Sequence, residues 1–379
     1  MRKTLAIALL PLAITACGGG SSTTANPTPI IQVATDVVAA ASASVAAQIG
    51  AMTVPGTTST TQAYDVVADL GDTWRILLNQ DGSYTIKVLS SQFGLTDING
   101  TYSQTTNGDF VAFAEANGKF ALILDKRTKT IAGTVTLGSK VSTVAGSGYA
   151  MPTDLSKLAG DYVYFGSTRN VATGSSQAVS GGSFRIAANG TDITLCDGGL
   201  VNATGSCTAI AGAPSANQLA LTLAKNSTNN LTQVKNGTAD FGILSLQAGD
   251  RGAVLVIDRF GYSQSTPSVL RAGAFYAVKQ HPLGGHEADG KWVCSDRGTI
   301  VGTLSVNGTA VQATNTAGQI SNETFNYNTA LGSAANGFVT SVANGGALAD
   351  DVLFIPLSSS LAVVERDSVQ SSAVCYLKS

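Results

Sequence analysis

The stretch Trp74-Arg75-Ile76-Leu77-Leu78-Asn79-Gln80-Asp81-Gly82-Ser83-Tyr84-Thr85-Ile86-Lys87-Val88-Leu89 carries the clearest sign of the fold. Two runs of alternating polarity, 74–78 and 84–89, flank the turn residues 79–82. Alternation with a period of two indicates a half-buried strand, and Asp-Gly tolerates the positive φ angles of a tight turn. The stretch therefore predicts an antiparallel β-hairpin.

The same kind of turn signal recurs along the chain from residue 62 onward. Asn-Gly occurs eight times and Asp-Gly three times, beginning at Asn99, Asn107, Asn117, Asn189, Asn236, Asn307, Asn336, Asn344, Asp81, Asp197 and Asp289. Such dipeptides between short alternating runs indicate hairpins. We therefore predict an all-β fold of antiparallel meanders that form two or three small barrel or sandwich modules, preceded by one short helix.

A weak internal repeat suggests where the modules divide. An apolar run that closes on an acid and a base occurs at 121–126, at 253–259 and at 361–366. Gly160 and Gly290 each stand two residues before an aromatic residue. We interpret these patterns as three β modules, residues 55–150, 151–285 and 286–379, with the alternative that the last two share one sheet system.

Composition excludes some classes of protein. The 379 residues are 44% hydrophobic and 12% charged, which indicates a chain that buries a core. The formal net charge is −2 and no run of Lys or Arg occurs, so nucleic acid is not an expected partner. Only two His residues are present, which leaves little room for His-based metal centres.

The Ala-rich segment 30–54 has helical periodicity. Its apolar residues are spaced by three and four, at Ile30, Val33, Val37, Ala41, Val45 and Ile49. This spacing places them on one face of a single amphipathic helix, which Gly50 can end. We expect the helix to cover its own sheet; docking on a barrel mouth or on a partner is the alternative.

The first 16 residues have the layout of a secretory signal. Arg2 and Lys3 precede an apolar run over 5–12, which is too short to span a membrane, and Cys17 follows at the end. Ile14-Thr15-Ala16-Cys17 resembles the lipobox of bacterial lipoproteins. The resemblance implies cleavage after residue 16, acylation of Cys17 by fatty acids such as palmitate, and, because Gly18 rather than Asp follows, delivery to the outer membrane. An ordinary cleaved leader with an incidental cysteine is the alternative.

The segment 17–29 is rich in Gly, Ser, Thr and Pro, a composition without a core to bury. We interpret it as a flexible tether between the acylated Cys17 and the folded part. The protein is then held at the membrane by its lipid anchor and not by a spanning segment.

Four cysteines remain after Cys17. An exported chain meets an oxidising compartment, and four thiols allow three pairings. Proximity favours Cys196 with Cys207, which leaves Cys294 with Cys375 to tie the first strand of the last module to its final strand. The cysteine spacings do not match those of a four-thiolate metal site.

Motifs for catalysis are weak throughout. His281 and His286 are five residues apart across Pro and Gly-Gly, which is typical of a linker and not of a metal-binding helix face. No Gly-x-Ser-x-Gly sequence occurs, and the adjacent acids Asp350 and Asp351 follow a turn signal. We therefore name no catalytic residue, no cofactor-binding residue and no metal ligand.

These observations favour an outer-membrane-anchored lipoprotein that acts as a non-catalytic surface binding protein with a protein or glycan ligand. In this respect it is broadly similar to barrel-bearing surface lipoproteins that serve as receptors. The alternative is a periplasm-facing structural or assembly partner of an outer-membrane complex. A hydrolase with an unrecognised site is a third hypothesis, for which the sequence offers no specific residues.

Overall fold

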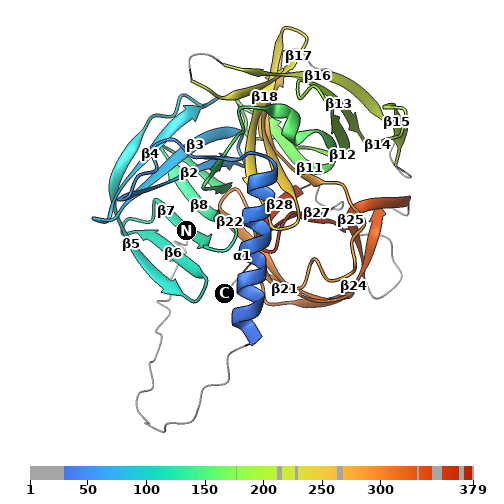
Figure 1. The fold of residues 1–379 in the computed structure, drawn as a ribbon. Coiled ribbons are helices and arrows are strands. Elements are labelled where there is room, and N and C mark those ends of the chain that lie inside the picture. Colours follow the sequence, from blue (N-terminus) through green and yellow to red (C-terminus); the bar gives the residue numbers. More distant parts are fainter. Residues whose placement is uncertain are drawn as a thin grey trace, which may run out of the picture.

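Three closed eight-stranded barrels make up most of the chain (Figure 1). The computed structural model describes residues 30–175, 177–210, 216–226, 229–262, 268–330, 333–343, 352–366 and 371–377. The all-β prediction is confirmed. The last two predicted modules do not share a sheet, because each closes on itself.

In each barrel the hydrogen-bonded order follows the order of the chain, so all three are up-and-down meanders. The first barrel contains β2 (Thr61–Ala68), β3 (Asp72–Asn79), β4 (Ser83–Ser90), β5 (Ile98–Asn107), β6 (Phe110–Glu115), β7 (Phe120–Asp125), β8 (Thr130–Leu137) and β9 (Lys140–Ser147). The second contains β11 (Gly160–Asn170), β12 (Ala178–Ile186), β13 (Asp192–Asp197), β16 (Asn217–Lys225), β17 (Thr232–Asn236), β18 (Ala239–Ala248), β19 (Ala253–Tyr262) and β20 (Leu270–Lys279). The third contains β21 (Gly290–Asp296), β22 (Thr299–Asn307), β23 (Ala310–Asn315), β24 (Ile320–Ala330), β25 (Ser333–Ala343), β26 (Val352–Pro356), β27 (Leu361–Arg366) and β28 (Ser371–Leu377).

Short elements join and decorate the barrels. Strand β1 (Met52–Thr53) pairs with β10 (Tyr149–Ala150), and β14 (Gly199–Val201) pairs with β15 (Cys207–Ala209). The 3-10 helix η1 (Leu155–Leu158) leads into β11.

The opening hairpin prediction is confirmed. Strands β3 and β4 pair with Leu78 opposite Tyr84, and Gly82 takes a φ of 82° in the turn. The Asp81 carboxylate accepts hydrogen bonds from the backbone N–H of Ser83 at 2.9 Å and from its hydroxyl at 2.7 Å. This Asx-type turn satisfies backbone groups that the ladder leaves free.

Gly337 belongs to an Asn-Gly pair that is not a turn. It lies inside β25 with a φ of 91°, and a Cβ there would be 2.9 Å from Val163 on the second barrel. Gly71 similarly meets the backbone of Gly273. At both positions glycine lets two barrels approach closely.

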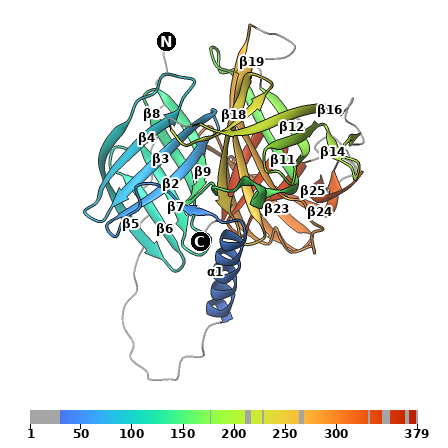
Figure 2. The same ribbon diagram turned by 45° about the horizontal axis from the view of Figure 1, so that its top comes forward.

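Helix α1 (Ile30–Gln48) does not cover the outer face of a sheet, so the default expectation for it is wrong. The side chains of Ala46 and Ile49 join the core of the second barrel together with Leu158, and Ser42 donates to the carbonyl of Ala248 at 3.5 Å. The helix therefore docks on one end of a barrel, and its N-terminal part extends away from the barrels (Figure 2). No helix among the described residues is long and apolar enough to cross a membrane.

An apolar core also lies between the barrels. Val163 and Phe165 of β11 are buried there, while Tyr162 and Tyr164 of the same strand point into the second barrel. Both faces of this strand are therefore buried, because the outer face packs against other barrels. The third barrel contributes Phe338, Leu353 and Ile355 among others, and the first contributes Val67, Ala132 and Ala145.

Two buried carboxyls lie where the first and second barrels meet. The hydroxyl of Thr73 donates to Asp258 at 2.7 Å, and the indole of Trp74 donates to Asp72 at 3.3 Å. Burial raises the pKa of Asp72 to about 6. Burial, with the nearby Asp72, raises the pKa of Asp258 well above its ordinary value.

These raised pKa values predict a loss of stability with rising pH. A carboxyl whose pKa is higher in the folded state contributes stability that is present at low pH and is lost as pH rises through the folded pKa. We expect Asp72→Asn to reduce the fall in unfolding free energy between pH 5 and 7 by about 1 kcal/mol. Urea unfolding at several pH values measures this effect. The exposed Asp192→Asn is the control, and an unchanged pH dependence in Asp72→Asn would contradict the interpretation.

Candidate functional site

The candidate site is a cavity of about 320 Å³ at one end of the third barrel. It opens at the end where β21 turns into β22 and β23 turns into β24. Every strand of this barrel except β25 contributes to its lining, which consists of Cys294, Val301, Gly302, Thr303, Leu304, Ala313, Thr314, Asn315, Glu323, Val352, Val364 and Ala373.

Small inward-facing residues leave this space open. Gly302 lies opposite Cys294 in the ladder, Ala313 lies opposite Leu304, and Ala373 lies opposite Val364. Directly opposite residues in an antiparallel pair share a face of the sheet, so these side chains form one inner layer. Side chains of this size do not fill a barrel of eight strands.

Aromatic rings fill the barrel beyond the cavity. The ring of Phe354 lies 5.2 Å from that of Phe325 and 6.1 Å from that of Trp292, measured between centroids. Trp292 is buried, and its indole N–H donates to the carbonyl of Ala288 at 2.8 Å. These rings belong to the core of the third barrel and are not part of the cavity lining.

Glu323 is the one ionisable residue of the described lining that is not in a disulfide. The hydroxyls of Ser321, at 3.0 Å, and Ser341 donate to its carboxylate. Ser321 lies on β24, the strand of Glu323 itself, and Ser341 lies on the neighbouring strand β25. A ligand that is mainly apolar and carries one hydrogen-bond donor or positive charge complements this arrangement.

The interiors of the other two barrels hold large side chains. In the first barrel Trp74 is buried, and the ring centroids of Tyr84 and Phe120 lie 4.8 Å apart. In the second, Tyr162 stacks on Phe184 at 5.1 Å. In the third barrel, small residues at one end line a cavity.

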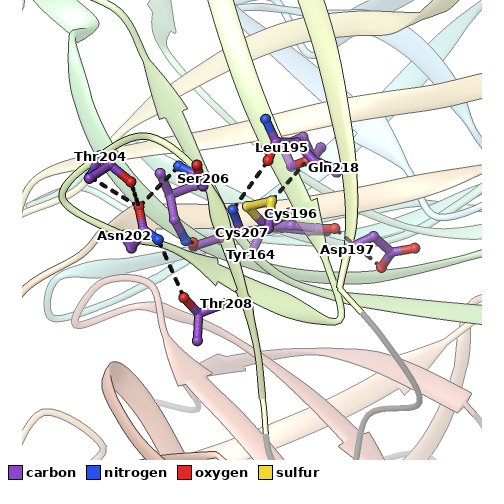
Figure 3. Close-up of a disulfide and its surroundings, with 12 residues drawn as sticks. Tyr164, Leu195, Cys196, Asp197, Asn202, Thr204, Ser206, Cys207, Thr208 and Gln218 are labelled. Carbon is purple, nitrogen blue, oxygen red and sulfur yellow. Dashed lines mark hydrogen bonds between the residues drawn. A yellow bond between two sulfur atoms is a disulfide. The ribbon is translucent and has the colours of Figure 1, made fainter.

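Both predicted disulfides are confirmed. Cys294 and Cys375 lie directly opposite each other on β21 and β28, so their bond joins the first and last strands of the third barrel beside the cavity. Cys196 and Cys207 join β13 to the β14–β15 hairpin, and Figure 3 shows this bond above the hydrogen-bonded Asn202 turn.

The remaining sequence candidates do not gather into a site. His281 contacts the carbonyl of Lys279 at 2.8 Å, and His286 pairs with Asp289 at 2.9 Å. The described residues include no group of three or more His, Cys, Asp or Glu side chains placed to hold a metal ion. Cys17, the tether and the pair Asp350-Asp351 lie outside the described residues.

Sequence reasoning missed Glu323 and the small residues of the cavity wall. Alternation marks Gly302-x-Leu304 and Ala373-x-Cys375 as inward-facing pairs, but it does not show which strands place their small residues at the same level. That level depends on the register between strands distant in sequence, such as β21 with β28.

The sequence matches no protein-family model and no curated protein. Among solved structures, a mosquitocidal holotoxin is similar over 85% of this chain, at 11% identity and a TM-score of 0.16, and the chain spans half the length of that toxin chain. The DNA polymerase III subunit beta from Pseudomonas aeruginosa is similar over 90% of this chain and 97% of its own, at 12% identity and a TM-score of 0.11. Both scores are too low to assign a fold family or a function.

The two disulfides should differ in their effect on stability. In the loop-entropy model a crosslink stabilises more when it closes a longer loop, and the sequence separations are 81 and 11 residues. We expect the pair Cys294→Ala and Cys375→Ala to cost about 4 to 5 kcal/mol, and the pair Cys196→Ala and Cys207→Ala about 3 kcal/mol. Urea unfolding of the two double variants measures both losses. The reverse order of losses would contradict the prediction.

Proposed function

We propose that the chain is a lipid-anchored, non-catalytic binding protein of the outer membrane whose third barrel takes up a small, mainly apolar ligand. The observation that carries the proposal is the cavity itself, with small and aliphatic residues in its wall and Glu323 in its lining. Pockets that bind small molecules combine such an apolar lining with a few placed polar groups.

The lining supports binding more than catalysis. Acid–base and nucleophilic sites generally combine a titratable base with a second titratable group or with a further group that orients the base. The described lining offers the carboxylate of Glu323, and the thiol of Cys294 is consumed in a disulfide. The serines beside Glu323 donate to it and so position it as an acceptor for a ligand.

The apolar lining also indicates which class of ligand fits the cavity. A glycan needs many hydroxyl partners and exposed aromatic rings on which to stack. The cavity offers mainly aliphatic side chains, and the large aromatic side chains of the described residues are buried or half-buried apart from Tyr262, which is 65% exposed. A small apolar molecule is therefore the better match to this cavity than the protein or glycan that the sequence suggested.

The position of helix α1 is compatible with a membrane anchor on the side of the molecule opposite the mouth of the third-barrel cavity. Strand β11 begins at Gly160, beside η1 and the docked helix, and ends at Asn170. Its eleven residues span about 33 Å. Arg297, in the turn at the cavity end of the third barrel, donates to Gly174, just beyond the far end of β11. A tether that leads into α1 thus leaves the cavity mouth directed away from the anchor.

A cavity-filling variant tests ligand uptake. Ala313→Leu places a larger side chain in the wall, so we expect it to weaken binding of the apolar fluorescent amine N-phenyl-1-naphthylamine by at least about tenfold, or about 1.4 kcal/mol. Ala310→Leu, on the exposed face of the same strand, is the matched control and should bind as the unaltered protein does. A fluorescence titration measures both affinities. Equal affinities in the two variants would place the probe elsewhere and contradict the proposal.

The anchor is tested separately. We expect the Cys17→Ala variant to lose labelling by an alkyne-tagged fatty acid and to move from the membrane fraction to the soluble fraction, because removal of the acyl chains removes the hydrophobic attachment. Ser21→Ala, four residues along the tether, is the control. Protease treatment of intact and lysed cells with a C-terminally tagged protein then separates a surface location from a periplasmic one. Membrane retention of Cys17→Ala would overturn the lipid anchor.

A further inference from the structure

A second cavity, of about 290 Å³, lies where all three barrels meet. The first barrel contributes the turns after β2 and β8 and the loop after β4, the second contributes the end of β11 with the turn that follows, and the third contributes Arg297. We refer to it as the junction cavity. It is separate from the cavity inside the third barrel, since the two linings have no residue in common.

Three cationic side chains line the junction cavity: Lys140, Arg169 and Arg297. The terminal nitrogen Nη2 of Arg169 donates to the carboxylate of Asp296 at 2.9 Å and to the side-chain oxygen of Gln177 at 2.6 Å. The other donors of this guanidinium, on Nε and Nη1, have no hydrogen-bond partner among the described residues. Each barrel contributes one of the three cations, so the positive charge is concentrated by the packing of the barrels.

The other two cations are also held in place. The guanidinium of Arg297 donates to the carbonyl of Gly174. The ammonium of Lys140 lies 4.8 Å from the ring centre of Phe93. Burial, and then the nearby Arg169, lower the pKa of Arg297, while the carboxylates of Asp296 and Asp69 act in the opposite direction.

Asp69 is the acidic residue of the lining. It accepts hydrogen bonds from the backbone N–H groups of Arg297 at 2.5 Å and Thr143 at 3.1 Å. Burial, and then the nearby Asp296, raise the pKa of Asp69 to about 7. Near neutral pH a large fraction of this carboxyl is protonated, so the cations outnumber the negative charges around the cavity.

We propose that the junction cavity is a binding site for a small anion that carries a phosphate or carboxylate group. Guanidinium groups present paired N–H donors that match the oxygens of such groups, and the partly enclosed position strengthens the attraction relative to water. An anion held by Lys140, Arg169 and Arg297 contacts all three barrels at once. Its binding therefore stabilises their packing, and this does not depend on the function proposed for the third barrel.

The test uses sulfate and succinate as probes, in calorimetric titrations at constant ionic strength with chloride as the reference ion. Sulfate presents the oxygens of a phosphate group without titrating near neutral pH, and succinate presents carboxylates. We expect Arg297→Gln and Lys140→Gln each to weaken binding of one or both probes by about tenfold, as for loss of one charge-assisted hydrogen bond. Arg185→Gln, in an ion pair with Asp161 on the second barrel, is the control.

Lys140→Gln keeps the test decisive if Arg297→Gln disturbs the barrel contact, because the Lys140 ammonium makes no inter-barrel hydrogen bond among the described residues. Binding that is unchanged in Lys140→Gln and Arg297→Gln, or no binding of either probe beyond that of chloride, would overturn the proposal. If these variants lose sulfate or succinate binding but still bind N-phenyl-1-naphthylamine as the unaltered protein does, the junction cavity is a site separate from the third-barrel cavity.

A pH series adds an independent readout. Asp69 faces Arg169 and Tyr276 of the second barrel and Asp296 and Arg297 of the third. Its protonation removes a negative charge from the cavity, so sulfate should bind more tightly at pH 6 than at pH 8. In Asp69→Asn this difference should shrink. A sulfate affinity that is the same at both pH values in the unaltered protein would contradict the role of Asp69.

Discussion

The packing of three closed barrels through their outer faces is the constraint on which the rest of the structure depends. A closed barrel has no free strand edge, so it joins another barrel through side chains that point outward and through the turns at its ends. Val163, Phe165 and Val256 of the second barrel meet Phe338 and other apolar residues of the third in one buried core. Strands at this core are buried on both faces, which gives them continuous apolar runs in place of alternation.

That constraint explains what the sequence could and could not predict. Local signals were sufficient for the β3–β4 hairpin and for the Cys196–Cys207 disulfide, because turn residues and a short separation act over a few residues. The Cys294–Cys375 disulfide, with a separation of 81 residues, followed from the two cysteines that remained. The apolar run at 253–259 belongs to β19, where Val254 and Val256 face the inter-barrel core and Leu255 and Ile257 face the barrel interior. Phe165 and Gly337 contact residues of another barrel, and a local sequence pattern cannot predict such contacts.

The same constraint places the two cavities. Because barrel ends meet at the junction, Arg169 and Arg297 from different barrels lie beside Asp69, although they are far apart in sequence. The third barrel, in contrast, owes its cavity to its own inner residues, Gly302, Ala313 and Ala373. One cavity is therefore charged and shared, and the other is apolar and contained within one barrel. Proteins built from modules often place ligand sites both within a module and at the contacts between modules.

The central claim is that the third barrel keeps an apolar cavity where the first and second barrels are filled by rings such as Trp74 and Tyr162. The most direct measurement is a crystal structure of the protein under xenon pressure, since xenon occupies dry apolar cavities. The account predicts xenon density beside Ala313 and Ala373 and none inside the first two barrels. Ordered water or protein side chains in place of xenon beside Ala313, or xenon inside the first barrel, would contradict it.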